Sequence, residues 1–247
     1  LMKKIVLGQN ERRKGELDAL QSQINPHFLY NTLESITWMI EGERNDEAAF
    51  MITQLARLFR ISLSKGRTVI TVADELQHAR SYMNIQKIRY KNAFSVVFDV
   101  DQEVCSCCTV KLILQPILEN AINYGVSGMD DCGEIRVTGR LEDGNVILSV
   151  TDNGIGMSEE QVALILTDSS RMHKRGSGVG LVNVNNRIRL LFGGEYGLTV
   201  ESEPDEGTTV SVRIPAVPYT EENRKILEQG YGFGGAEMID GRSRGNE

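Results

Sequence analysis

The chain has 247 residues, which is enough for two domains that each bury a hydrophobic core. Its formal net charge is -7 with 25% charged residues, and this balance argues against a nucleic-acid-binding surface as the main function. No window holds the roughly 20 apolar residues of a membrane span, and no signal peptide opens the chain. Because the sequence begins at Leu1, we expect a piece of a longer protein whose missing part includes a membrane anchor.

The cysteines favour a reduced protein over a metalloprotein. Their C-x-C-C spacing is not that of a zinc finger or ribbon, and no histidine lies near them: Cys105, Cys107, Cys108 and Cys132. Incidental thiols are the preferred interpretation, and a metal site is the alternative.

Residues 1–90 are predicted to be helical. A first helix spans about 11–40, with a bend at Pro26 and an end at Gly42. A second spans 45–64 and carries a heptad-like seam of Ala48, Ile52, Leu55, Phe59 and Ser62. One helical hairpin cannot bury both of its apolar faces, so we expect two copies to form a four-helix bundle. The alternative is a hairpin that packs on its own second domain.

A third helix is predicted from Thr71 to about Tyr90, with Thr71 or Asp74 as its cap. The pattern then changes to a mixture of strands and helices, so we place a domain boundary near residue 91 and a second domain at 91–216. Its predicted elements, in order, are a strand (94–100), a helix (109–124), strands (134–141, 146–152), helices (158–166, 180–192) and strands (196–203, 208–214). Residues 217–247 read as a tail, poorly ordered beyond about 228.

The second domain predicts a mixed sheet covered on one face by helices. Turns are expected at Asp143-Gly144 and at 203–207, between successive strands. The fold class is therefore α+β: a helical hairpin followed by an α/β sandwich.

The run from Asn25 to Leu33 places His27 inside a helix, after a proline and before apolar residues. A histidine is a nucleophile near neutral pH and accepts phosphoryl groups, although a lone histidine on an apolar face is more often part of the packing.

Three later stretches read together as a nucleotide pocket. In the helix at 109–124, an apolar face leaves Gln115, Glu119, Asn120 and Asn123 on the other side, where oxygen ligands suit Mg²⁺; an ordinary polar helix face is the alternative. At 152–156, an aspartate after a strand can accept a hydrogen bond from the amine of adenine; a simple Asx turn is the alternative.

The third stretch, Gly176-Ser177-Gly178-Val179-Gly180-Leu181, leads into a helix whose N-terminus can bind phosphate. It matches neither a P-loop nor a dinucleotide fingerprint. The preceding residues 167–175 are polar and suit a lid, from which Lys174 and Arg175 would reach the phosphates.

Residues 23–33 closely resemble the phosphoacceptor box of LytS/YesM-like sensor histidine kinases. The later stretches resemble the N, G1 and G2 boxes of their GHKL (Bergerat-type) ATP-binding domain. The resemblance covers about residues 15–215, with four motifs in the expected order.

The resemblance implies a cytoplasmic kinase core of a two-component membrane sensor, homodimeric, using ATP and Mg²⁺. His27 would take the γ-phosphate and pass it to an aspartate of a response regulator receiver domain. Asn120 would bind Mg²⁺ and Asp152 adenine. The pocket and lid would be shaped by Gly154, Gly156, Gly176, Gly178 and Gly180, with Leu181 beside them, and Thr208 would supply a late strand contact.

Some positions depart from the common pattern. Phe28 follows the histidine where many histidine kinases have an acid, so Glu119 is our candidate base, with Asn31 orienting the imidazole. Asn123 stands where the family commonly has lysine. Pro116 replaces the water-activating glutamate of related ATPases, which favours transfer to histidine over hydrolysis. The alternatives are a GHKL-type ATPase and a catalytically weak ATP-sensing scaffold.

Overall fold

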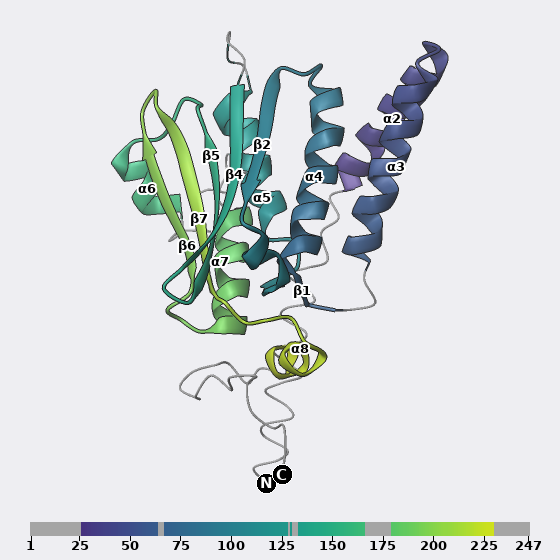
Figure 1. The fold of residues 1–247 in the computed structure, drawn as a ribbon. Coiled ribbons are helices and arrows are strands. Elements are labelled where there is room, and N and C mark those ends of the chain that lie inside the picture. Colours follow the sequence, from purple (N-terminus) through teal and green to yellow (C-terminus); the bar gives the residue numbers. More distant parts are fainter. Residues whose placement is uncertain (1–25, 64–66, 128, 130–132, 166–178, 230–247) are drawn as a thin grey trace, which may run out of the picture.

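The computed structural model describes residues 26–63, 67–127, 129, 133–165 and 179–229. A long helix pair, α2 (Pro26–Glu41) and α3 (Asn45–Ser62), stands beside α4 (Val72–Arg89), and a sheet domain lies on the other side of α4 (Figure 1). Mixed α+β architecture is therefore confirmed. The predicted bend at Pro26 depends on residues outside this range, because α2 starts there.

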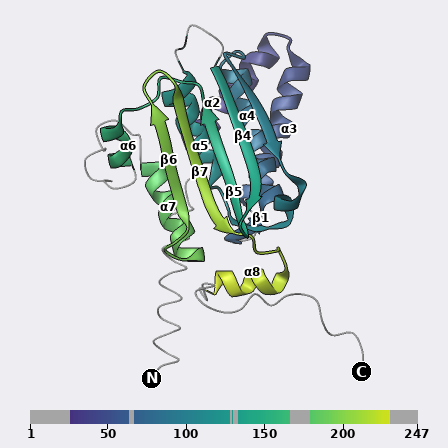
Figure 2. The ribbon, with the colours of Figure 1, turned by 60° about the vertical axis from the view of Figure 1, so that its left-hand side comes forward.

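The five-stranded sheet has the order β2-β4-β5-β7-β6. Only β2 and β4 run parallel, so the sheet is mixed as predicted. Its helices gather behind one face, as Figure 2 shows. The strands are β2 (Phe94–Val100), β4 (Gly133–Glu142), β5 (Asn145–Asp152), β6 (Gly197–Glu203) and β7 (Gly207–Pro215).

The sheet's period of two explains which face carries the core. Side chains such as Ile135 in β4, Leu148 in β5 and Val212 in β7 are fully buried, and their neighbours in sequence point to the open face. The predicted turn at Asp143-Gly144 is present, with both residues at positive φ (47° and 74°).

The remaining helices are α5 (Leu114–Asn120), α6 (Glu159–Ile165), α7 (Val179–Phe192) and α8 (Glu221–Glu228). The helix predicted over 109–124 is wrong at its start and irregular at its end. Residues Cys108–Val110 form β3, which pairs with β1 (Val69–Thr71) in a separate two-stranded sheet. After α5 the helix widens to π-helical pairing over Ala121–Val126, where Ser127 N–H bonds to the Ile122 carbonyl at 2.9 Å.

Two helix caps use threonine side chains. Thr71, one of the two predicted caps, accepts the Asp74 N–H at 3.0 Å. Thr220 caps α8 in the same way, and sequence analysis predicts no helix there. Glu228 in α8 accepts the N–H groups of Thr68 (2.9 Å) and Val69 (3.2 Å), which fastens this helix to the start of β1.

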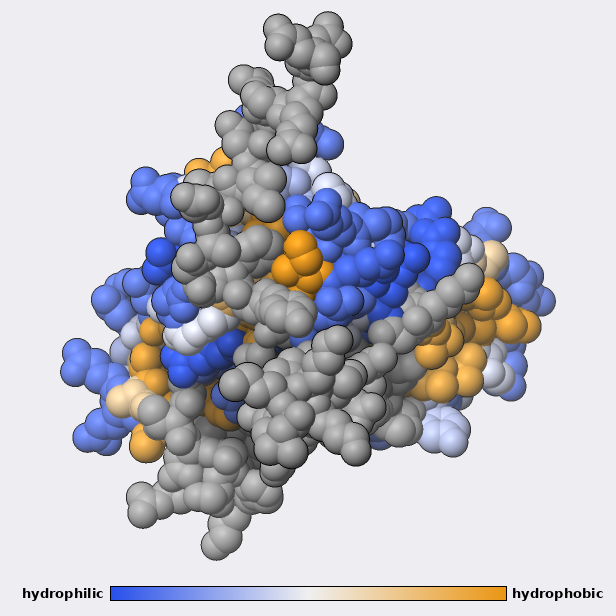
Figure 3. All heavy atoms as spheres, turned by 90° about the horizontal axis from the view of Figure 1, so that it is seen from below, coloured by the Kyte–Doolittle hydropathy of each residue, from blue (hydrophilic) through white to orange (hydrophobic). Residues whose placement is uncertain are grey.

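The seam predicted for α3 is only partly correct. The face packed inward carries Ala48, Met51, Leu55, Leu58 and Ile61, whereas Ile52 is exposed and Phe59 half-buried. Seen from below, polar side chains dominate the described surface, and apolar ones gather at the right, where Figure 1 places α2 and α3 (Figure 3). Among the described residues no helix is both long and apolar enough to cross a membrane.

Candidate functional site

His27 lies in the first turn of the described part of α2, with its imidazole exposed. The next residue, Phe28, is 5% exposed and packs on Tyr82 of α4, with ring centroids 5.2 Å apart. Because neighbouring helical residues point about 100° apart, burying Phe28 keeps His27 turned outward. The Asn31 amide nitrogen lies 3.2 Å from both imidazole nitrogens, so this side chain is in reach to orient the ring.

Helix α5 presents the predicted polar face. Its predicted apolar residues are all buried: Leu114, Ile117, Leu118, Ala121 and Ile122. Glu119 is half-buried and accepts a hydrogen bond from the Gln115 side chain at 2.8 Å. Burial raises the pKa of Glu119, while hydrogen bonds from Gln115 and Tyr82 oppose this rise. Asn120 is half-exposed at the end of α5, and an amide oxygen is of the hard type that divalent cations such as Mg²⁺ prefer.

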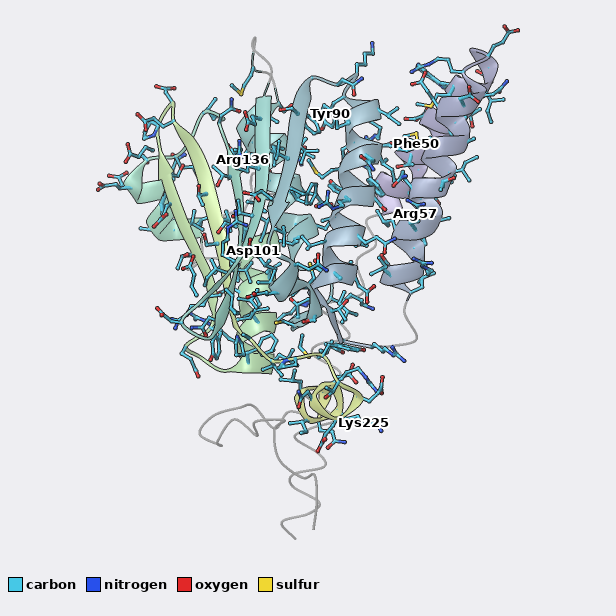
Figure 4. All side chains as sticks on the ribbon, viewed as in Figure 1. Phe50, Arg57, Tyr90, Asp101, Arg136 and Lys225 are labelled. Carbon is cyan, nitrogen blue, oxygen red and sulfur yellow. The ribbon has the colours of Figure 1, made fainter. Side chains whose placement is uncertain are left out.

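Asn123, three residues after Asn120 in the π-helical segment, is exposed. Its side-chain oxygen accepts a hydrogen bond from the Tyr90 hydroxyl at 3.3 Å. Tyr90 lies at the end of α4, near the top of the molecule (Figure 4). Asn123 therefore bonds to α4, and its neutral side chain adds no positive charge.

Asp152 ends β5 with its carboxylate nearly buried, at 5% exposure. One oxygen accepts the Gly154 N–H at 3.0 Å, which is the Asx turn considered as the alternative to ligand binding. Burial raises the pKa of Asp152 to about 6, and hydrogen bonds from the backbone of Gly154 and Thr208 oppose the rise. The Asp152 carboxyl group is thus largely ionised at pH 7 and can accept a further hydrogen bond.

Glycines let three segments meet around this carboxylate. A Cβ on Gly125, at the end of the π-helical turn, would lie 2.5 Å from the Asp152 Oδ1. A Cβ on Gly154 would lie 2.3 Å from the Gly125 backbone, and one on Gly156 would lie 1.8 Å from the Glu203 carbonyl. No side chain fits at such distances, so the end of the α5 segment is in direct contact with the turn after β5.

Thr208 stands opposite Asp152 in the β5–β7 register. Its hydroxyl lies 2.9 Å from that of Ser202, which also accepts the Met157 N–H at 2.8 Å. Asp152 and Thr208 share the wall of a hollow of about 670 Å³ between α6 and strands β5 to β7. The hollow also carries four glutamates (Glu159, Glu201, Glu203 and Glu206), an acidic lining that is unsuited to a triphosphate.

The structure thus brings some predicted site residues together and not others. Asp152 and Thr208 line the hollow together, and the Gly154 N–H bonds to the Asp152 carboxylate. Gly156 lies against the Glu203 backbone, and neither Asn120 nor Asn123 lines the hollow. Gly180 approaches α5 closely: its Cβ would lie 3.3 Å from that of Pro116. Leu181 is buried, so its side chain serves the packing of α7. Lys174, Gly176 and Gly178 lie outside the described residues, as does the whole of the predicted lid at 167–175.

Sequence reasoning missed two residues around Asp152. Gly125 is required because its Cα faces the carboxylate, and Ser202 joins the turn at Met157 to Thr208. A glycine in the last turn of a polar helix was the available signal for the first. Nothing in the sequence near Ser202 marks it.

Two family models match the chain in succession. The first, described as histidine kinase, matches residues 15–94. The second, described as histidine kinase-, DNA gyrase B- and HSP90-like ATPase, matches residues 109–218. The two matches leave residues 95–108 between them, and the second includes α5, Asp152 and Thr208.

Curated relatives are sensor kinases. Sensor histidine kinase YesM of Bacillus subtilis is 39% identical, covering 87% of this chain and 36% of YesM. Sensor histidine kinase BtsS of Escherichia coli is 32% identical, covering 87% and 37%. Sensor protein LytS of Staphylococcus saprophyticus is 33% identical, covering 85% and 36%. The chain therefore spans little more than a third of the length of these relatives.

A solved histidine kinase domain, from a blue-light-activated histidine kinase of Erythrobacter litoralis, is 16% identical with a TM-score of 0.46 and covers 89% of this chain and 98% of that one. The histidine kinase model and the ATPase model match the chain in succession, and the curated relatives match most of its length. The chain therefore belongs to the sensor histidine kinase family.

Proposed function

We propose that the protein is an autophosphorylating histidine kinase of a two-component system. His27 attacks the γ-phosphorus of ATP through a ring nitrogen, a P–N bond forms, the bond to the β-phosphate oxygen breaks, and ADP leaves. The phosphoryl group then passes to an aspartate of a response regulator receiver domain. The observation that carries this proposal is the exposed His27 imidazole, held outward by the packing of Phe28 in a chain that also contains an ATPase-like domain.

The binding residues divide the nucleotide between them. Asp152 accepts a hydrogen bond from the adenine amine, and Gly154, Gly156 and Thr208 shape the pocket around it. Asn120 binds the Mg²⁺ that ATP carries, which would neutralise charge on the phosphates during transfer. A single amide ligand fits this role because Mg²⁺ usually takes most of its ligands from phosphates and water. Lys174, Gly176, Gly178 and Gly180 belong to the phosphate end.

Two side chains assist the attack of His27, one by orienting the imidazole and one by accepting its proton. Asn31 orients the imidazole, since its amide is within hydrogen-bonding distance but cannot take a proton at neutral pH. Glu119 is the candidate base. Its hydrogen bond with Tyr82, the residue on which Phe28 packs, supports this assignment.

The division into domains is part of the proposal: a dimerisation and phosphoacceptor domain at 1–90, an ATP-binding domain at 91–216 and a C-terminal segment at 217–247. Two copies pair through α2 and α3 into a four-helix bundle. The exposed apolar residues of these helices, among them Trp38 (69%) and Ile52 (51%), support this over a hairpin that packs only on its own chain. We place this chain on the cytoplasmic side of a membrane sensor.

Incubation with γ-labelled ATP and Mg²⁺ tests the kinase. We expect acid-labile label on the wild-type protein and none on His27→Gln, while Asp143→Asn, in the exposed β4–β5 turn, keeps the label. Release of free phosphate without labelled protein would instead support an ATPase, which Pro116 disfavours. Neither product would support an ATP-sensing scaffold, to which Asn123 lends some weight.

A further inference from the structure

Residues 111–113 directly precede α5, which begins at Leu114. This segment is hydrogen-bonded to side chains from several elements. Leu112 has φ of 60°, a left-handed conformation that is uncommon for a residue with a side chain of this size. Such a conformation persists where its surroundings fix it. The contacts that fix it here come from α4 on one side and α7 on the other.

Glu75 of α4 holds the N–H groups. Its fully buried carboxylate accepts the backbone N–H groups of Leu112, Ile113 and Leu114 at 2.7, 2.7 and 2.8 Å. Leu114 is the first residue of α5 and Ile113 its N-cap, so their N–H groups have no partner within the helix. Burial alone raises the pKa of Glu75, and these hydrogen bonds together with the nearby Arg187 charge oppose the rise.

Arg187 of α7 holds the carbonyl groups. Its buried guanidinium donates to the Leu112 carbonyl at 3.2 Å and also to the Lys111 carbonyl. The backbone of this short segment is therefore bonded on its donor side to α4 and on its acceptor side to α7, the helix that follows the glycine-rich stretch.

Lys111 connects the same segment to the hairpin. Its side chain is 5% exposed, and the ammonium donates to the carbonyl of Ser62, the last residue of α3, at 3.0 Å. A cation at a helix C-terminus also interacts favourably with the helix dipole. The Ser62 hydroxyl lies 3.0 Å from Nε2 of the buried His78, so α4 and Lys111 hold the end of α3 together.

We infer that Lys111 is a positioning residue, through which the end of the hairpin helix α3 sets the placement of the helix that carries Glu119 and Asn120. The inference rests on the proposed kinase function for its catalytic consequence. A displacement of α3 moves the Lys111 side chain. The Lys111 backbone cannot shift independently, because Arg187 is bonded to its carbonyl and Glu75 to the N–H groups of the three residues that follow. The shift is therefore passed to the start of α5 and to α7. Buried bonds to three elements make this segment a joint between the two family-matched regions.

The first test compares Lys111→Met, Lys111→Arg and Lys225→Met in the full chain. Lys225→Met removes the same charge from an exposed site on α8 (Figure 4). We expect Lys111→Met to lower the maximal rate of autophosphorylation about tenfold, with the KM for ATP and the affinity for a fluorescent ATP analogue within about twofold of wild type. Lys111→Arg, which keeps a donor, recovers rate, and Lys225→Met matches wild type.

A proportional loss of rate and affinity in Lys111→Met, or an unchanged rate, would overturn the inference. If the wild-type protein takes no label at all, the kinase proposal fails instead, and the second test decides the joint independently. Amide hydrogen exchange of the unliganded proteins needs no catalysis. Lys111→Met should exchange faster than Lys225→Met both in the last turn of α3 and in the first turn of α5. Faster exchange in α3 alone would show that no coupling passes through Lys111.

Discussion

The hairpin and the sheet domain differ in how completely they bury their apolar side chains. Seven of the twelve large apolar residues that are exposed within the described part of the chain lie in or directly after α2 and α3, although these helices are a small part of it: Tyr30, Leu33, Trp38, Ile40, Phe50, Ile52 and Leu63. Both sides of the helix pair are apolar, and α4 covers one of them. The sheet domain instead closes its core with its own helices.

This difference separates what each region needs. A helix pair with an uncovered apolar side gains stability from a second copy, whereas a sheet with a filled core does not. We therefore expect substitutions on the outer face of the hairpin to weaken self-association but not nucleotide binding. Substitutions around Asp152 should weaken nucleotide binding but not self-association.

The largest expected effect is on association. Trp38→Glu with Ile52→Glu places two charges on the outer face of the hairpin, and we expect self-association to weaken more than about 100-fold, since each lost apolar burial costs roughly 1.5–3 kcal/mol. Sedimentation velocity measures this, and affinity for an ATP analogue should stay as in wild type. The matched control, Val97→Glu with Leu141→Glu, changes two exposed residues of the sheet domain. Equal dissociation of both double variants would refute the comparison.

Asp152→Asn should weaken binding of an ATP analogue by about 10- to 100-fold, because a hydrogen bond to a charged acceptor contributes roughly 1.5–3 kcal/mol. Calorimetric titration measures the affinity. Asp143→Asn, in the exposed β4–β5 turn, serves as control and should bind normally. Wild-type affinity in Asp152→Asn would remove this residue from the nucleotide site.

The same carboxylate makes stability depend on pH. The Asp152 pKa is raised from 3.8 to about 6 in the fold, so the native state keeps its proton to higher pH than the unfolded chain. Its contribution to the free energy of unfolding is fully present below pH 3.8 and is lost as pH rises through 6, in total about 3 kcal/mol at most. Urea unfolding at pH 5 and pH 7 should show roughly 1.3 kcal/mol of this loss in wild type and none of it in Asp152→Asn, which is then the more stable protein at pH 7. A parallel pH response of the two proteins would contradict the assignment.

Gly125→Ala should lower the free energy of unfolding by about 1–3 kcal/mol, because the added methyl group overlaps the Asp152 carboxylate. Thermal or urea unfolding measures the change. Gly194→Ala is the control, since nothing lies within 4 Å of its Cβ position. Similar stabilities of the two variants would mean that the contact between the π-helical turn and Asp152 relaxes easily.

The smallest effect is expected from Asn123→Lys. Restoring a cation at this exposed position should raise the autophosphorylation rate by about two- to fivefold, the scale of an exposed charge interaction. Thr199→Lys adds the same charge on the exposed side of β6 and should have no effect. A rate increase in both variants would point to overall charge rather than to the pocket.

Much of the fold follows from local patterns in the sequence. The bounds of β2 (94–100) are predicted to the residue. The turn predicted at Asp143-Gly144 is present, and both of its residues have positive φ. By contrast, β1 and β3 have three residues each, too few to show a period, and they pair across 39 residues. The π-helical turn at Ala121–Val126 is also not predicted by a helical period, and its Gly125 contacts Asp152, which is 27 residues away.

The parts of the candidate site that lie within a single sequence motif could be predicted from the sequence. The Asp152 turn, the polar face of α5 and the reach of Asn31 to His27 each lie within a few residues of sequence. The roles of these residues remain predictions, as do the domain limits. Lys111, Glu75 and Arg187 could not be found in this way, since their partners lie between 37 and 76 residues away and depend on packing.

The hydrogen bonds between α8 and the start of β1 have a consequence for the choice of recombinant fragments of this chain. The ATPase family match stops at residue 218, which makes that position an inviting place to end a recombinant fragment. Yet Glu228, ten residues later, accepts the N–H groups of Thr68 and of Val69, the first residue of β1. A fragment ended at 218 leaves that edge without its acceptors, so a gene for the ATP-binding part should start before Thr68 and run past Glu228.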